Sequence, residues 1–286
     1  MRNFIIFLLF SISCFANSSD QKEFFQERGF LWVKNFFSEK QVAMLRSISD
    51  EINETAKGLL LLDDQGKGLA QTIPGVPIVV AEALNPYQVC RTEDLLSCYP
   101  NLYHLIEGTI TTFLGQLFDE PYVLFKDKLN YKWPNGGAFS PHQDHPAFEL
   151  FGPTEFITAM VCIDEATLEN GCLYIAENWK QDLLTDDHTI LPYVVGGKDH
   201  GTIQKMWTDK LNWLPLKASP GDLVIFTSFV PHYSEINKSE GPRRALFLTY
   251  NKLFEGDLRK TYYYMKRNDP ENPVFHFATP TKARNK

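Results

Sequence analysis

Two histidines and an aspartate have the types and spacing best suited to chemistry in this chain. His142 and Asp144 lie two residues apart, just after the turn Pro134-Asn135-Gly136-Gly137. We expect their side chains to point to one face of a sheet. His232 follows a predicted strand much later in the chain. An imidazole and a carboxylate on one face are two adjacent ligands for a divalent transition metal, and His232 would supply a third.

An arginine completes the set, because Arg243 stands a short distance after His232 at the start of the next predicted strand. Two neutral imidazoles and one carboxylate would leave Fe(II) three free positions for an oxo-acid and O2. A guanidinium can clamp the distal carboxylate of such an acid through two hydrogen bonds. Arg244 competes for this role. Neighbouring strand positions face opposite ways, so only one arginine can enter the site, and the spacing from His232 favours Arg243.

Six short motifs accompany these residues. With them, the stretch 128–243 resembles the phytanoyl-CoA dioxygenase family of Fe(II)- and 2-oxoglutarate-dependent oxygenases, and the resemblance extends more weakly over residues 22–270. The motifs, in the family's order, are Asn130-Tyr131-Lys132-Trp133-Pro134, His142-Gln143-Asp144, Ile157-Thr158-Ala159-Met160, Asn170-Gly171-Cys172-Leu173, Pro220-Gly221-Asp222 and His232-Tyr233-Ser234.

The resemblance implies a set of site residues. By matching position, iron would be bound by His142, Asp144 and His232. The C5 carboxylate of 2-oxoglutarate would be bound by Arg243 and Ser234. Three further residues would line the cosubstrate or substrate side of the site, namely Gln143, Asn130 and Lys132.

The resemblance also implies the reaction. A small organic substrate would be hydroxylated with O2 while 2-oxoglutarate is converted to succinate and CO2. An aspartate at position 144 favours hydroxylation, because halogenating members of the superfamily usually have glycine or alanine there. The family's substrates include acyl thioesters, amino-acid derivatives, alkylphosphonates and natural-product intermediates. The loops at 57–100 and 177–213 would decide among them, and the end of the chain resembles bacterial small-substrate members more than the acyl-CoA enzyme.

The elements that must position these residues are mainly strands. Short β-rich runs separated by turn signals predict a jelly-roll, cupin-like core at about 120–255, a double-stranded β-helix, with flanking helices. We expect strands in Gly29–Val33, Tyr122–Trp133, Phe156–Ile163, Cys172–Ala176, Leu223–Thr227 and Ala245–Tyr250. The length of 286 residues suits a single domain over 17–286.

Helices are predicted in three places. Ser38-Glu39-Lys40-Gln41 is a capping box before an apolar stripe. A second helix spans Leu102 to Leu117, with Gly108 weakening its middle. A third covers Asp257 to Arg267, and the segment 57–100 between the first two is expected to form long loops with short elements.

The N-terminus has the order of a signal peptide. Arg2 is followed by an apolar run, Phe4 to Phe10, and then by small residues up to Ala16, so residues 1–16 form a predicted leader. The run is too short for a stable membrane span, which needs about 20 residues. The leader suggests export to the periplasm or outside the cell. An enzyme that consumes Fe(II) and 2-oxoglutarate suggests the cytoplasm, so the sequence leaves the compartment open.

Two other functions stay open beside the dioxygenase. One is a non-catalytic, exported jelly-roll binding protein, and the other is a metal-dependent cupin-like enzyme that does not use 2-oxoglutarate. Nucleic acid is not an expected partner, because the net charge is -7. The cysteines left after the leader are interpreted as buried free thiols in preference to disulfides: Cys90, Cys98, Cys162 and Cys172.

Several charged residues receive a structural interpretation. His145 is interpreted as structural or substrate-facing and not as a metal ligand, because it would point away from Asp144 if both lay on a strand. Arg91, Lys126 and Lys128 are interpreted as solvent-exposed charges, with recognition of an anionic group as the alternative. Five aromatic residues that could surround a substrate are expected to belong to the core: Trp133, Phe139, Phe148, Phe151 and Trp179.

Overall fold

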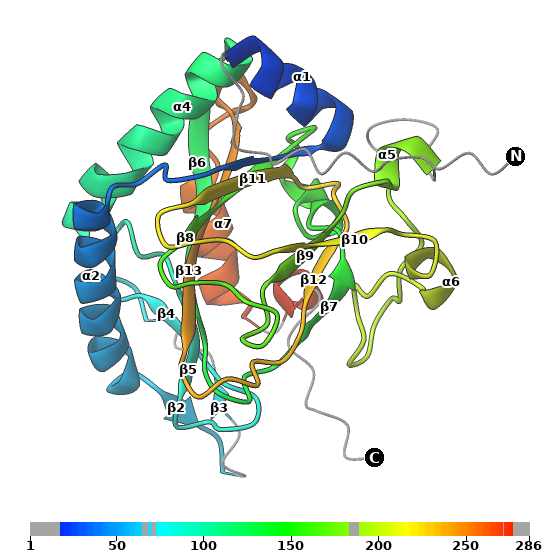
Figure 1. Ribbon diagram of the computed structural model, residues 1–286. Coiled ribbons are helices and arrows are strands. Elements are labelled where there is room, and N and C mark those ends of the chain that lie inside the picture. The colour runs from blue at the N-terminus through cyan, green and yellow to red at the C-terminus, as the bar shows by residue number, and fades with distance from the viewer. Residues whose placement is uncertain (1–17, 65–67, 70–72, 183–188, 271, 277–286) are drawn as a thin grey trace, which may run out of the picture.

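Two antiparallel β-sheets lie face to face and form the body of the molecule (Figure 1). The computed structural model describes residues 18–64, 68–69, 73–182, 189–270 and 272–276, so the predicted leader at 1–16 lies outside the described residues. This arrangement confirms the predicted jelly roll. Within the described ranges, no helix combines the length and the apolar character that a membrane span requires.

The larger sheet has seven strands and the smaller has four. The larger has the order β1 (Phe30–Val33), β11 (Leu223–Thr227), β8 (Ile157–Cys162), β13 (Arg243–Lys252), β6 (Tyr122–Lys132), β5 (Val89–Glu93) and β4 (Ile78–Ala81). The smaller has the order β10 (Trp213–Leu216), β9 (Leu173–Ala176), β12 (His232–Ser234) and β7 (Phe139–His142). A separate hairpin pairs β2 (Leu61–Leu62) with β3 (Gly68–Leu69).

Helices cover the outer face of the large sheet. Figure 1 shows α2 (Glu39–Lys57) and α4 (Gly108–Phe118) on one side of this sheet and the small sheet on the other. The predicted capping box begins α2, where the Ser38 hydroxyl and the Gln41 side chain each bond the other's backbone N–H. The remaining helices are α1 (Ser18–Arg28), α3 (Pro100–Leu102), α5 (Trp179–Asp182), α6 (Lys205–Thr208) and α7 (Arg259–Asn268), with short 3₁₀ turns at His145–Ala147, Glu149–Phe151, Leu253–Glu255 and Pro273–His276.

Two apolar layers result from the alternation of side chains along the strands. Leu129, Leu246 and Leu248 lie in the layer that packs against α2 and α4. Met160 and Phe226 face the other way and pack with Ile175 of the small sheet. The face of the large sheet that looks toward the small sheet therefore also holds the polar side chains of the site.

The segment 57–100 consists of loops with short elements, as expected, and two of these elements are strands of the large sheet. Its strands β4 and β5 add to β6 and extend the large sheet, with Arg91 opposite Asn130 and Glu93 opposite Lys128. The prolines and glycines around these short runs concealed them, because isolated strands of four or five residues gain their stability from their neighbours. The predicted helix at 102–117 is also divided, since a π-helical turn at Tyr103–Glu107 precedes α4, which begins at Gly108.

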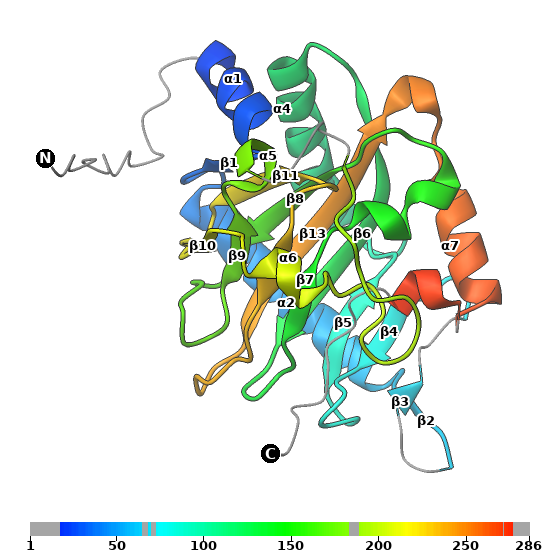
Figure 2. The same cartoon turned by 90° about the vertical axis from the view of Figure 1, so that its right-hand side faces the viewer.

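Helix α7 packs beside β6 at the edge of the large sheet (Figure 2). Arg259 donates to Asp127 and Asp94 at 2.6 and 2.8 Å, and Lys266 donates to Glu93 at 2.6 Å. These buried ion pairs bind the C-terminal helix to the strands that form one wall of the site.

Asp222 joins the N-terminal strand to the rest of the sheet. Its buried carboxylate accepts hydrogen bonds from Trp32 Nε1, from the Asn35 backbone N–H and from the Ser219 backbone N–H, at 2.9, 2.9 and 3.0 Å. The turn Pro220-Gly221-Asp222 thus holds β1 in register at the start of β11.

We expect Asp222→Ala to lower the free energy of unfolding by about 1–3 kcal/mol, because three donors lose their acceptor at once. Urea denaturation followed by circular dichroism measures this change. Asp209→Ala is the control, since Asp209 makes an exposed ion pair with Lys205 and its loss should cost less than about 0.5 kcal/mol. Equal stability of the two variants would contradict the role given to Asp222.

Candidate metal and cosubstrate site

Two histidines face each other across neighbouring strands of the small sheet. β12 pairs with β7 so that His232 stands directly opposite His142. Their ring centroids lie 4.2 Å apart, and both side chains are buried. Antiparallel pairing therefore brings together two residues that are far apart in the sequence.

Asp144 is brought close to the two histidines by the turn that follows β7, and not by the alternation of side chains along a strand. β7 ends at His142, and Asp144 has helical backbone angles just before the 3₁₀ turn His145–Ala147. Its carboxylate oxygens lie 3.7 Å from His142 Nε2 and 4.0 Å from His232 Nε2. The ligand atoms of all three residues lie within 4.8 Å of one another. The predicted proximity is therefore observed, although its geometric cause is different.

His145 lies in the wall next to this cluster. Its Nδ1 is 3.2 Å from the Ser228 hydroxyl, and its ring stacks on Phe229 with centroids 4.0 Å apart. These contacts favour the structural role over the substrate-facing one, and the residue lies on a 3₁₀ turn and not on a strand.

Backbone carbonyls orient both imidazoles. Nδ1 lies 2.6 Å from the Ser140 carbonyl in His142 and 2.9 Å from the Val230 carbonyl in His232. A carbonyl can only accept a hydrogen bond, so Nδ1 carries the hydrogen and donates it. Each Nε2 then has its lone pair free toward the Asp144 carboxylate, which is the arrangement that metal-binding histidines require.

The electrostatics keep the histidines neutral and the aspartate ionised. Burial, followed by His232, lowers the pKa of His142 to about 3, and burial also lowers the pKa of His232. Burial alone would raise the pKa of Asp144, but the neighbouring His232, His142, Lys128 and Lys126 lower it to about 2. At neutral pH the cluster offers two neutral nitrogens and one carboxylate.

Two buried cations lie side by side on the facing sheet, and one of them, Lys132, contacts Ser234 on the strand that carries His232. Arg243 of β13 lies opposite Lys132 of β6 and is 5% exposed. Throughout the ranges that the structure describes, the Arg243 guanidinium has no ion pair, and its Nε lacks a hydrogen-bond partner. Burial and the nearby Arg243 lower the pKa of Lys132 well below its usual range. A buried guanidinium without an anion is costly, so this place is suited to a carboxylate ligand.

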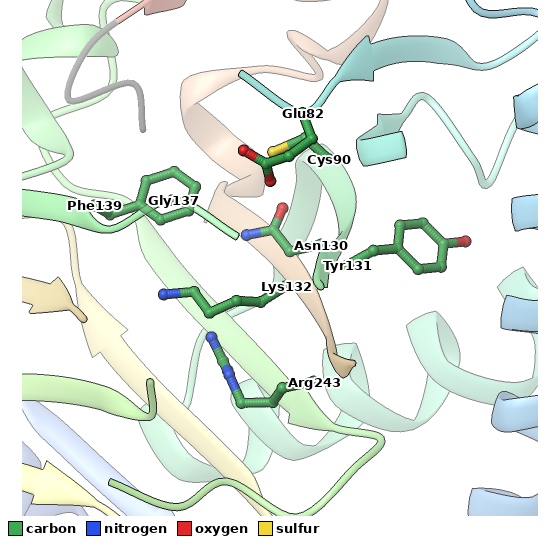
Figure 3. Close-up of a pocket in the computed structure, with 8 residues that line it drawn as sticks. All are labelled: Glu82, Cys90, Asn130, Tyr131, Lys132, Gly137, Phe139 and Arg243. Atoms are coloured by element: carbon green, nitrogen blue, oxygen red, sulfur yellow. The ribbon is translucent and has the colours of Figure 1, made fainter. Parts of the chain in front are cut away.

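Ser234 and Asn130 complete this end of the site. The Lys132 ammonium donates to the Ser234 hydroxyl at 2.8 Å and to the Glu235 carbonyl. Figure 3 shows Lys132 and Arg243 extending side by side, whereas Tyr131 points away. A small cavity is lined by Asn130, Lys132 and Arg243, together with Tyr131, Glu82, Cys90, Gly137 and Phe139. The buried Asn130 Oδ1 has no hydrogen-bond partner among the described groups.

Arg244 points to the opposite side of the strand. Its Nε and Nη2 donate to the two Asp164 oxygens at 2.7 and 2.9 Å, and its Nη1 donates to Asp50 of α2 at 2.6 Å. This arginine joins the sheet to α2 and leaves the site to Arg243.

Gln143 has a different position from the one predicted. Its Nε2 donates to the Thr189 and Phe229 carbonyls at 3.0 and 2.6 Å, and its Oε1 accepts from the Leu191 N–H at 2.7 Å. Backbone groups thus already accept from and donate to the Gln143 side-chain amide. The structure favours a positioning role for Gln143, which holds the segment at Leu191, over the predicted contact with cosubstrate or substrate.

The charges predicted to be solvent-exposed are not exposed. Arg91 is 8% exposed and donates to Glu93 at 2.8 Å, while Lys126 and Lys128 are partly buried. The alternation that places Asn130 and Lys132 on one face of β6 also places Lys126 and Lys128 there. The same alternation was available in the sequence and predicts the shared face, although not the burial of the two lysines.

The cysteines and the aromatic residues can also be compared with the sequence-based expectations. Cys90, Cys98, Cys162 and Cys172 are free thiols in the structure, as the interpretation of the cysteines favoured. Phe148 and Trp179 belong to apolar clusters of the core, whereas Phe139 lines the cavity beside Arg243.

The residues fit Fe(II) and 2-oxoglutarate. Two imidazoles and one carboxylate on one side of a site are the ligand set of non-haem Fe(II) oxygenases that leave coordination positions open. The unpaired Arg243 guanidinium next to this set is suited to the distal carboxylate of a dicarboxylic oxo-acid.

Comparison with known proteins agrees with this fit. Residues 25–245 match the family model described as phytanoyl-CoA dioxygenase (PhyH). The chain is 34% identical over 251 residues to a 2-aminoethylphosphonate dioxygenase from an uncultured bacterium, covering 87% of both chains. It is 35% identical over 254 residues to a methylphosphonate hydroxylase from Gimesia maris, covering 87% of this chain and 86% of that one.

Solved structures share the fold at lower identity. EctD from S. alaskensis, in a complex with 2-oxoglutarate and 5-hydroxyectoine, has a TM-score of 0.65 at 19% identity, covering 84% of this chain and 77% of that one. EvdO2 from Micromonospora carbonacea, in a complex with 2-oxoglutarate, has a TM-score of 0.59 at 20% identity, covering 82% of this chain and 90% of that one. These findings do not favour the non-catalytic binding protein or the enzyme without 2-oxoglutarate. The chain belongs to the phytanoyl-CoA dioxygenase family and is an Fe(II)- and 2-oxoglutarate-dependent dioxygenase.

Proposed function

We propose that this dioxygenase hydroxylates a small organophosphonate. The support for this substrate class is the similarity over 87% of the chain to two proteins named for 2-aminoethylphosphonate and methylphosphonate. The cationic inner face of β6 is compatible with such an anion. A single domain over 17–286 would carry the whole activity.

The observation that carries the assignment of roles is the buried Arg243 next to the triad. In the proposal, His142, Asp144 and His232 hold Fe(II), and Arg243 pairs with the C5 carboxylate of 2-oxoglutarate. Lys132 and Ser234 bind the same carboxylate, since they already contact each other opposite Arg243. Asn130 lines the cosubstrate side.

The protein's own groups orient and protect the reaction. The bound iron would supply the activation of O2 that is coupled to decarboxylation of 2-oxoglutarate. The hydrogen bonds that His142 and His232 donate from Nδ1 to the Ser140 and Val230 carbonyls keep both Nε2 atoms directed at one point. Phe226, whose ring lies 4.9 Å from that of His232, helps to exclude water from the site.

The substrate proposal is tested with purified protein, Fe(II), 2-oxoglutarate and O2. We expect methylphosphonate or 2-aminoethylphosphonate to give one hydroxylated product per succinate, measured by phosphorus NMR and by succinate analysis. Succinate formation that neither phosphonate stimulates, with no new phosphorus signal, would reject the proposed substrate class while leaving the dioxygenase intact.

We expect Asp144→Ala to lower 2-oxoglutarate turnover at least ~1000-fold, because the metal loses its only anionic protein ligand. Succinate formation at saturating Fe(II) measures this loss, and Asp209→Ala is the matched control on the surface. Turnover at the wild-type rate in Asp144→Ala would exclude the three-residue metal site.

Arg243 and Arg244 can be compared directly, because they are neighbours in the sequence but point to opposite faces of the sheet. We expect Arg243→Met to raise the 2-oxoglutarate concentration for half-saturation at least ~30-fold, because a buried carboxylate loses a charged partner worth about 2 kcal/mol or more. Arg244→Met should change this concentration less than ~3-fold, since Arg244 pairs with Asp164 and Asp50. The reverse pattern would transfer the carboxylate clamp to Arg244.

A further inference from the structure

Four cations face the interior from the large sheet without a carboxylate partner. They are Lys126, Lys128 and Lys132 of β6 and Arg243 of β13, and none of them has an ion pair in the part of the chain that the structure describes. By contrast, the nearby Arg91 and Lys266 share the Glu93 carboxylate at 2.8 and 2.6 Å. Lys132 and Arg243 are assigned to 2-oxoglutarate under the proposed function. Lys126 and Lys128 therefore remain without an assigned anion.

The two lysines lie next to the metal ligands. The Lys126 ammonium is 4.3 Å from the centroid of Phe148, which belongs to the turn segment that follows Asp144. The Lys128 ammonium is 5.0 Å from the centroid of Phe247, its cross-strand partner on β13. Both ammoniums contribute to lowering the pKa of the Asp144 carboxyl, so both lie within electrostatic range of it.

The charges of Asp144 and Glu93 act on both lysines, but Asp144 is assigned to Fe(II) under the proposed function. Glu93 lies opposite Lys128 in the sheet but is already bound to Arg91 and Lys266. Burial lowers the pKa of Lys126 to about 7, and the like charge of Lys128 adds to this effect. Aromatic rings supply only a weak attraction for the ammonium groups. An anionic ligand between the two ammonium groups would compensate their charge and lower the free-energy cost of burying them.

We infer that Lys126 and Lys128 bind the anionic headgroup of the substrate and select a doubly charged tetrahedral group over a carboxylate. This inference rests on the proposed function, because it assigns residues to the substrate half of the same site. Two separate ammoniums can each donate to a different oxygen of a phosphonate, whereas 2-oxoglutarate is held further along the same pair of strands, at Lys132 and Arg243. The rings of Phe148 and Phe247 form the apolar sides of this headgroup site.

The experiment measures two bindings separately in the anaerobic holoprotein. The visible absorption of the Fe(II)–2-oxoglutarate complex reports cosubstrate binding, and titration of that complex with methylphosphonate reports headgroup binding by calorimetry. The variants are Lys126→Met and Lys128→Met. Lys210→Met is the control, because its ammonium also stands over an aromatic ring, 4.6 Å from Trp207, but on the exposed surface.

We expect each site variant to weaken methylphosphonate binding at least ~30-fold and to shift the 2-oxoglutarate titration less than ~3-fold, whereas Lys210→Met changes neither. Acetate, the carboxylate analogue, should bind wild-type protein at least ~10-fold more weakly than methylphosphonate. A shift of the 2-oxoglutarate titration above ~10-fold, with methylphosphonate binding unchanged, would overturn the inference and assign the lysines to the cosubstrate.

The outcomes separate this inference from the proposed function. If methylphosphonate is hydroxylated equally well by wild-type and lysine variants, the proposed function stands and the headgroup site is rejected. If methylphosphonate binds through the lysines but is not hydroxylated, the headgroup site stands and the proposed substrate is rejected. If wild-type protein forms the absorption band but binds no phosphonate, both the headgroup site and the phosphonate proposal are rejected.

Discussion

Positive charge buried without a protein counter-ion is the physical constraint on which the site depends. Removing an ammonium or a guanidinium from water is costly unless an opposite charge or several acceptors replace the lost hydration. Lys132 and Arg243 lie opposite each other on adjacent strands, and among the described residues the ammonium donates to Ser234 and Glu235 whereas the Arg243 Nε has no acceptor. Favourable packing and hydrogen bonds elsewhere in the fold help to offset this cost.

Much of this stabilisation comes from the outer face of the large sheet. On the outer face, leucines of β6 and β13 pack under α2 and α4, and Tyr131 donates to the Ser49 carbonyl of α2 at 2.9 Å. Asp127, also on β6, accepts hydrogen bonds from the Leu95 and Leu96 N–H groups and from Arg259 of α7. Asp127, Leu129 and Tyr131 of β6 thus contact the outer layer of the fold. The charged side chains between them, such as Lys128 and Lys132, point to the interior.

Much of the site could be predicted because it depends on residue types in a fixed order. His142, Asp144 and His232 converge as expected, and the choice of Arg243 over Arg244 follows from strand alternation, which places one arginine inside and the other on Asp164. The strands β6, β8 and β11 were predicted from their own apolar runs.

The rest depended on tertiary contacts. β4, β5 and β12 are too short to be identified without their neighbours, so the segment 57–100 was predicted to be mostly loop. The role of Gln143 depends on Leu191 and Phe229, which are distant in the sequence. The burial of Lys126 and Lys128 depends on Phe148 and Phe247, and a lysine seen in isolation is usually exposed.

The most direct test of the account is an anaerobic crystal structure of the protein with Fe(II), 2-oxoglutarate and methylphosphonate. We expect the metal to be bound by His142, Asp144 and His232, and each of the two anions to be bound by a different pair of cationic side chains. The C5 carboxylate would lie within hydrogen-bond distance of Arg243 and Lys132, and the phosphonate within the same distance of Lys126 and Lys128. An interior in which either pair remains without its anion while the ligands bind elsewhere would contradict the account.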